Sequence, residues 1–105
     1  MSAKDWKDML EAAQEGDLEL VRSYLEQGVN PDYQHPEYLT TPLIESIVHH
    51  HLHITRYLLE QGANPRLKAG FSMDTPLRMA RRSGNRAAVE LLKPYYPKKL
   101  FGFGF

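Results

Sequence analysis

The segment LLEQGANPR, residues 58–66, repeats the segment YLEQGVNPD, residues 24–32, with changes at three of nine positions. The two segments lie 34 residues apart, and the tripeptide TPL at residues 41–43 recurs at the same spacing at residues 75–77. A fixed period of this length is typical of proteins built from stacked structural repeats. The period predicts three units, the third of them truncated, at residues 5–38, 39–72 and 73–93.

Each unit carries two apolar stripes with helical spacing, which in the first unit cover residues 9–13 and 18–25. Gly28 and Gly62 stand where a helix ends in the left-handed conformation, and the Asn-Pro after each glycine cannot continue the helix. One pair of short helices cannot bury its own apolar side, so neighbouring pairs must stack. The sequence therefore predicts an all-α solenoid of stacked antiparallel helix pairs joined by protruding finger loops. Its predicted core contains Leu43, Leu58, Leu59, Leu77, Val89, Leu91 and Leu92.

These motifs resemble the ankyrin repeat, in which a TPLH-x-AA helix, a Gly-His turn and a second helix with LLL-x-x-GA precede a protruding finger. TPL with LLEQGANP in the second unit, and TPLRMARRSGNRAAVELL in the third, match that pattern within residues 5–93. The family's histidine after TPL is replaced by Ile44 in the second unit and Arg78 in the third. The hydrogen bonds that this histidine makes between loops are therefore expected to be missing. The resemblance implies a non-enzymatic protein-binding module.

Size and composition exclude several other classes of protein. A chain of 105 residues makes one small domain. The absence of cysteine excludes disulfides, thiolate zinc sites and cysteine nucleophiles. No apolar run approaches the roughly 20 residues that a membrane helix needs, and the N-terminal MSAKDWKDML lacks the apolar segment of a signal peptide. We therefore expect a soluble, cytoplasmic protein without contact with a membrane.

Charge is divided unevenly between the two halves of the chain. Residues 1–50 contain three Lys/Arg and ten Asp/Glu, a net charge of −7, whereas residues 51–105 contain ten and three, a net charge of +7. One acidic and one basic end favour a monomer with weak head-to-tail self-association. An alternative function is nucleic-acid binding by the basic half, although the acidic half repels phosphate. That alternative would use Arg66, Lys68, Arg78, Arg81, Arg82, Arg86, Lys98 and Lys99.

Four of the five histidines lie in VHHHLH, residues 48–53, which raises the question of a metal site. In the repeat register His49 ends one helix, His50 replaces the turn glycine of the other units, and His53 lies in the next helix. The turn separates His49 from His53, so no metal site is predicted. The favoured interpretation makes His51 a helix-capping turn residue and leaves the others facing solvent. A left-handed backbone at His50 would carry strain of roughly 1–2 kcal/mol.

No catalytic or cofactor-binding motif is present. No serine stands in a Gly-x-Ser-x-Gly motif, and neither glycine-rich phosphate motif occurs. Asp5, Asp8, Glu11 and Glu15, at spacings of three and four, form the polar face and the acidic first turns of a helix. The sequence therefore predicts no enzyme activity, no cofactor and no metal.

The resemblance places partner contacts on a concave side made of finger tips and of the exposed ends of the first helices. Aromatic residues and arginine are the usual anchors of such interfaces. The small size suggests, by analogy, an adaptor, or an inhibitor such as an immunity or antitoxin-like protein. Phe71 and Met73 have the alternative role of packing the finger bases, and His35 is either a contact or a plain exposed residue. The predicted contact residues are Gln14, Glu15, Tyr33, Glu37, Tyr38, Thr40, Val48, His49, Phe71, Ser72, Asp74, Arg82 and Ser83.

Both ends of a solenoid need a cover. Pro94 and Pro97 end the last helix, and residues 94–105 form a tail outside the repeats. The segment LFGFGF, residues 100–105, is predicted either to fold back over the apolar end of the third unit or to be offered to a partner as a peptide. At the other end, Trp6 is expected to cover the first unit.

Overall fold

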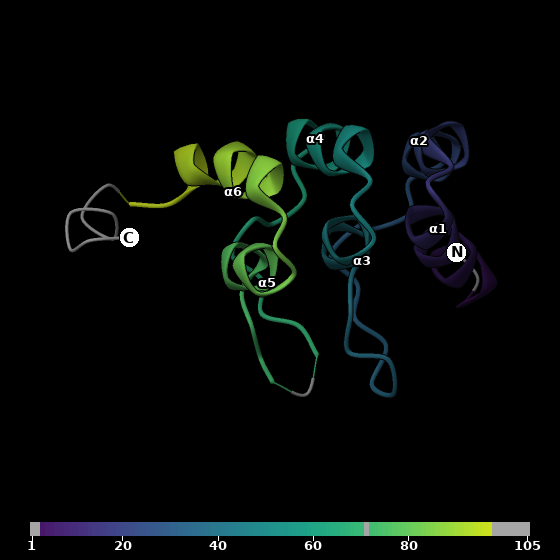
Figure 1. Ribbon diagram of the computed structural model, residues 1–105. Helices are drawn as coiled ribbons and strands as arrows, with labels where there is room; N and C mark the ends of the chain where they lie inside the picture. The colour runs from purple at the N-terminus through teal and green to yellow at the C-terminus, as the bar shows by residue number, and fades with distance from the viewer. Residues whose placement is uncertain (1–2, 71, 98–105) are drawn as a thin grey trace.

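Six helices in three pairs, and a short 3-10 helix, make up the part of the chain that the computed structural model describes, residues 3–70 and 72–97. In Figure 1, α1, α3 and α5 form one layer and α2, α4 and α6 the other. These residues contain no strand, only an isolated bridge between Ala69 and Asp74. The predicted all-α solenoid is confirmed. The elements are α1 (Ala3–Glu15), α2 (Leu18–Glu26), α3 (Pro42–Val48), α4 (Leu52–Glu60), α5 (Pro76–Arg82), α6 (Arg86–Leu92) and η1 (Lys93–Tyr95).

The TPL motif starts the first helix of the second and third units. The Thr41 hydroxyl accepts a hydrogen bond from the Ile44 N–H at 3.2 Å, and the Thr75 hydroxyl accepts one from the Arg78 N–H at 3.2 Å. The proline that follows each threonine has no N–H to leave unpaired in the first turn. Because the same local bonds form twice, α3 and α5 begin at equivalent positions.

The turn inside each pair uses a left-handed residue. Gly16 has φ +88°, Gly84 has φ +68°, and His50, at the equivalent position of the second unit, has φ +61°. His50 therefore keeps the left-handed geometry of the glycine that it replaces. An L-residue in this region carries a steric penalty of roughly 1–2 kcal/mol.

Equivalent apolar positions stack from one unit to the next. Leu43, Leu58, Leu59, Leu77 and Leu92 are buried, as predicted. Val89 and Leu91 are only partly buried and pack against the core; Leu91 lines a hollow between α4 and α6. Burying one leucine side chain contributes about 1.5–3 kcal/mol, so the stack rests mainly on these contacts.

Two loops project from the layer of α1, α3 and α5 on the side away from the other helices: the first finger, residues 27–41, and the second finger, residues 61–75 (Figure 1). Hydrogen bonds connect the two fingers although the family's histidine after TPL is absent and Ile44 is buried in its place. Gln34 Nε2 donates to the carbonyl oxygen of Lys68 at 2.8 Å, and the Asn64 N–H donates to Asp32 Oδ1 at 2.8 Å.

The chain closes over the third unit after α6. Tyr96 is buried, and its hydroxyl donates to the carbonyl oxygen of Pro65 at 2.6 Å while accepting a hydrogen bond from the Leu77 N–H at 3.4 Å. Tyr96 thus supplies part of the cover that was predicted for residues 100–105, which lie outside the described residues.

Among the helices of residues 3–70 and 72–97, none has the length and apolar character of a membrane-spanning segment.

Candidate protein-binding surface

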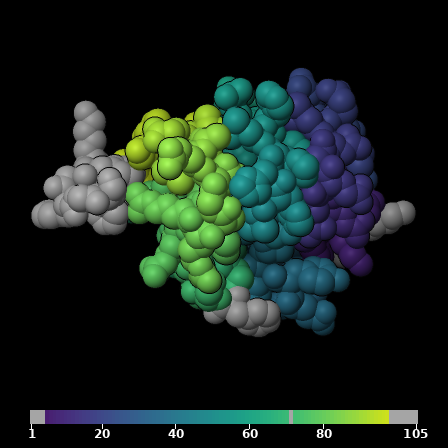
Figure 2. All heavy atoms as spheres, viewed as in Figure 1, coloured from purple at the N-terminus to yellow at the C-terminus, as the bar shows by residue number. Residues whose placement is uncertain are grey.

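The predicted concave side corresponds to the surface formed by α1, α3, α5 and the two fingers, which we call the inner face. The helices present equivalent positions along it. Gln14, Val48 and Arg82 share one register, and the residues after them, Glu15, His49 and Ser83, share the next. Figure 2 shows the three units as successive bands across the molecule, with the first finger in blue below the first unit. A partner crossing these bands would meet a different side chain on each unit.

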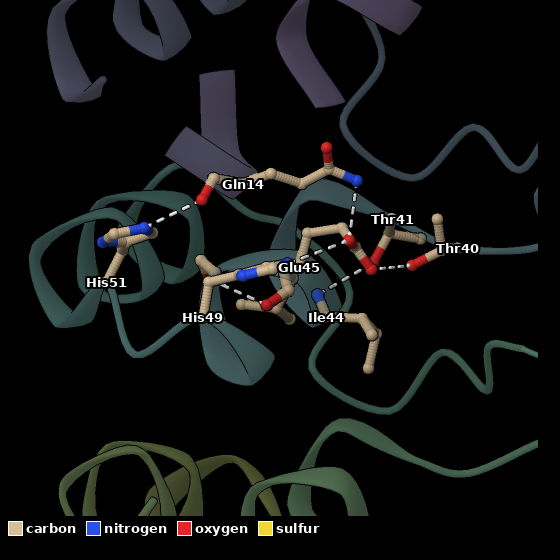
Figure 3. A network of polar contacts seen from close by, with 9 residues as sticks. Gln14, Thr40, Thr41, Ile44, Glu45, His49 and His51 are labelled. Atoms are coloured by element: carbon tan, nitrogen blue, oxygen red, sulfur yellow. Dashed lines mark hydrogen bonds and ion pairs between the residues drawn. The ribbon is translucent and has the colours of Figure 1, made fainter. Parts of the chain in front are cut away.

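Glu45 links three of the predicted contact residues (Figure 3). Gln14 Nε2 donates to Glu45 Oε1 at 2.8 Å, and Thr40 Oγ1 donates to Glu45 Oε2 at 2.8 Å. His49 Nε2 lies 3.7 Å from Glu45 Oε1. Glu45 was not among the contact residues predicted from the sequence. Its position one turn before His49 on the same helix is the signal that could have identified it.

His51 connects the second unit to the first. It stands at the N-cap position of α4, but its side chain makes no capping hydrogen bond. The expectation that His51 is a helix-capping turn residue is thus confirmed for its position, and its side chain bonds elsewhere. Its Nε2 instead donates to the carbonyl oxygen of Gln14 at 2.9 Å. A Cβ at Gly16 would lie 2.7 Å from His51 Cε1, so the glycine leaves room for the ring.

The other histidines of residues 48–53 follow the predicted arrangement. α3 ends at Val48 and α4 begins at Leu52, so the turn separates His49 from His53. His49, His50 and His53 are exposed, and the rings of His49 and His51 stack with centroids 6.4 Å apart. Across residues 3–70 and 72–97, no three histidine or carboxylate side chains gather as a metal site would require.

Four rings gather where the first finger meets α1: Trp6, Tyr33, His35 and Tyr38, the first-finger aromatic cluster. The ring centroid of Trp6 lies 5.3 Å from that of Tyr33, 5.0 Å from that of His35 and 5.7 Å from that of Tyr38. Trp6 also packs against the hydrophobic core, which agrees with its expected covering role. Tyr33 and Tyr38 remain 42% and 45% exposed, so the structure brings two predicted contact residues together at the surface.

A shallow hollow of about 250 Å³ separates α1 from the base of the first finger. Glu37 is exposed beside Tyr38 on the same finger. Two residues that the sequence analysis missed, Lys7 and Glu11, reach this hollow because they lie on the same side of α1 as Gln14. The hollow is lined by Lys7, Leu10, Glu11, Gln14, Tyr38 and Thr40.

The base of the second finger is held by a buried carboxylate. Asp74 is 4% exposed; Ser72 Oγ donates to its Oδ2 at 2.9 Å, and Arg82 donates to the same oxygen. Arg78 Nε lies 3.4 Å from Asp74 Oδ1. The Ser72 hydrogen bond and the two guanidinium groups lower the pKa of Asp74 although burial opposes them. Three predicted contact residues, Ser72, Asp74 and Arg82, thus bind one another.

The remaining predicted residues have simpler surroundings. Glu15 and Val48 are exposed, and Ser83 Oγ donates to the carbonyl oxygen of Met79 at 2.7 Å at the end of α5. Met73 is exposed, so the alternative that it packs the finger base is wrong; its left-handed backbone, φ +55°, turns it away from the core. Phe71 lies outside the described residues.

Stacked helix pairs with protruding fingers and a polar, partly aromatic inner face define a repeat protein of the interaction class. The family model for ankyrin repeats, in three copies, matches residues 9–100. The chain therefore belongs to the ankyrin repeat family. Ankyrin repeats are generally protein–protein interaction modules, and domains built from them are typically non-enzymatic. The comparison with curated proteins found no match.

Proposed function

We propose that the chain binds one protein partner through the inner face. The observation that carries this proposal is the distribution of exposed apolar side chains. Of the six large apolar side chains that are well exposed in the described residues, Tyr33, Tyr38, Val48 and Met73 lie on the inner face, whereas Leu20 and Tyr95 do not. Exposed apolar groups rimmed by polar residues mark interaction sites, because a partner removes them from water.

Two networks of hydrogen bonds and ion pairs support the same proposal. Glu45 holds Gln14, Thr40 and His49, and Asp74 holds Ser72 and Arg82. Side chains fixed before binding lose less conformational entropy when a partner arrives. The more specific role, as an adaptor or as an inhibitor of the immunity type, rests on size and analogy.

The alternative function, nucleic-acid binding by the basic half, has weaker support. Arg78 and Arg82 are the basic side chains of α5 nearest the second finger, and both pair with Asp74. The single carboxylate of Asp74 offsets the charge of only one of these two guanidinium groups, so the pair contributes less to phosphate binding than two arginines without a carboxylate would. Protein binding is therefore the function that the site favours.

A capture experiment with matched variants tests the proposal. The tagged chain is used to capture proteins from its native host, alongside two double variants. Tyr38→Ala with His49→Ala changes the inner face. Tyr95→Ala with His53→Ala removes the same exposed residue types from η1 and α4.

We expect the inner-face variant to lose the captured protein and the control variant to keep it, with both variants folded by circular dichroism. Loss of the captured protein with the control variant alone would refute the inner face as the binding surface.

A further inference from the structure

We propose that the first-finger aromatic cluster receives an arginine or lysine side chain of the protein partner, with the cation over the exposed ring of Tyr38. This inference rests on the proposed inner-face binding and adds the chemistry of the partner. It defines that partner as one whose contacting segment is basic. A cation over a tyrosine ring is attracted by the negative potential of the ring face.

The cluster is a firm platform. Trp6 packs against the hydrophobic core and contacts the other three rings, and the centroids of His35 and Tyr38 lie 5.2 Å apart. Tilted and stacked contacts at these distances stabilise aromatic groups beyond their burial. Tyr33 and Tyr38 are nevertheless well exposed, so the platform holds its rings in place while leaving part of their surface open.

Tyr38 already attracts a cation from its own chain. Lys7 Nζ lies 6.0 Å from the ring centroid of Tyr38, at the outer limit of a cation–π contact. Elsewhere, Arg22 lies closer to Tyr57, at 5.0 Å. The cation–π contact between Lys7 and Tyr38 is thus longer than that between Arg22 and Tyr57, and Lys7 is exposed to solvent. A guanidinium group from a partner can replace that lysine on the ring.

The charges around Tyr38 favour a cation over an anion. Glu11 lines the same hollow as Tyr38, and Glu37 precedes Tyr38 on the finger. The Glu37 N–H donates to His35 Nδ1 at 3.1 Å, which ties Glu37 to the cluster beside Tyr38. Lys7 is the cation that the partner's side chain would displace from the Tyr38 ring. The surrounding half of the chain, residues 1–50, has a net charge of −7 and attracts a basic segment.

The test uses two synthetic peptides of the same length. One alternates glycine with three arginines, and the other carries citrulline, which has the shape of arginine without its charge. Each peptide is titrated into the full-length ¹⁵N-labelled chain at low salt, and chemical shifts are followed by NMR. We expect the arginine peptide to shift the Trp6 indole N–H and the amides of residues 33–38, and the citrulline peptide to shift neither.

Three variants separate the ring from the fold. Tyr38→Leu should weaken arginine-peptide binding by about 5- to 10-fold, whereas Tyr38→Phe should stay within about twofold. Lys7→Gln should strengthen binding, because it removes the competing cation, and this variant leaves every ring of the cluster in place. Melting temperatures show whether each variant is folded.

Equal shifts with both peptides, or arginine-peptide affinity unchanged by Tyr38→Leu and by Lys7→Gln, would overturn the inference. If the captured partner depends on the inner face but the arginine peptide does not bind, only the basic chemistry of the partner is wrong. If the partner ignores the inner face, the proposed function itself fails.

Discussion

The two junctions between units use the same register position in different ways. At the first junction His51 reaches the carbonyl oxygen of Gln14, beside the Glu45 network on the inner face. At the second junction the equivalent residue, Asn85, is 6% exposed, and its Nδ2 donates to the carbonyl oxygen of Ile47 at 3.0 Å. Both hydrogen bonds between units start from the same position of the repeat. The bond is partly exposed where that position is histidine and buried where it is asparagine. The first junction thus shares polar groups with the proposed binding surface, whereas the second is internal.

The largest effects are expected from the apolar stack that both junctions share. Leu58 and Leu92 lie 34 residues apart and are fully buried. Replacing either with alanine should lower the free energy of unfolding by roughly 2–5 kcal/mol, the usual range for a buried leucine. The effect at Leu58 should be at least as large, because it belongs to the unit with a neighbour on both sides. Chemical denaturation measures both variants, and an unchanged midpoint for Leu58→Ala would show that the repeat register is wrong.

The next experiment compares the two crossing bonds directly. Asn85→Ala should cost about 1–3 kcal/mol, since it removes the cap of α6 and the buried hydrogen bond from Asn85 Nδ2 to the Ile47 carbonyl oxygen, which still accepts from the His50 N–H. His51→Ala should cost about 0.5–1.5 kcal/mol, because water can reach the half-buried first junction. Both values come from urea unfolding. A larger loss for His51→Ala would reverse the proposed difference between the junctions.

Acid should weaken the base of the second finger, which the Asp74 carboxylate holds together. The folded pKa of Asp74 is lowered from its ordinary value of 3.8, so its stabilising effect is present above that pH and is lost as the pH falls through the folded pKa. The equivalent residue of the first finger is Thr40, which has no ionisable group of its own and donates to the Glu45 carboxylate. The difference in unfolding free energy between the wild type and Asp74→Asn should therefore shrink below pH 3.8. A constant difference from neutral pH to well below that value would contradict this assignment.

The smallest effect concerns the turn of the second unit. His50→Gly should stabilise the chain by up to about 1 kcal/mol, because it relieves a left-handed L-residue but adds the flexibility of glycine to the unfolded chain. Gly84→Ala, at the equivalent position, is the matched control and should destabilise. Thermal unfolding measures both. A less stable His50→Gly variant would mean that the exposed imidazole makes a stabilising contribution larger than the backbone strain.

The helices could be predicted because their signals are local. Thr-Pro before a helix and Gly-x-Asn-Pro after one act within a few residues, so the repeated copies identify the units, and the register places His50 at the position of the turn glycine. Contacts between units are harder to predict. The position of His51 followed from the period, but its partner did not, because an N-cap side chain can bond within its own turn or to the previous unit. Asp74 and Arg82 were each predicted to contact a partner, but their bond to each other was not predicted.

The close approach of Gly16 and His51 gives the units a fixed order. At the first junction the His51 ring, at the start of α4, faces Gly16, the turn residue of the first unit, which has no side chain. At the second junction the shorter Asn85 follows the unit whose turn residue is His50. A copy of the second unit placed directly after itself would set a His51 ring against the side chain of His50. The units are therefore not interchangeable modules, and a lengthened stack would need compensating changes at both positions of each new junction.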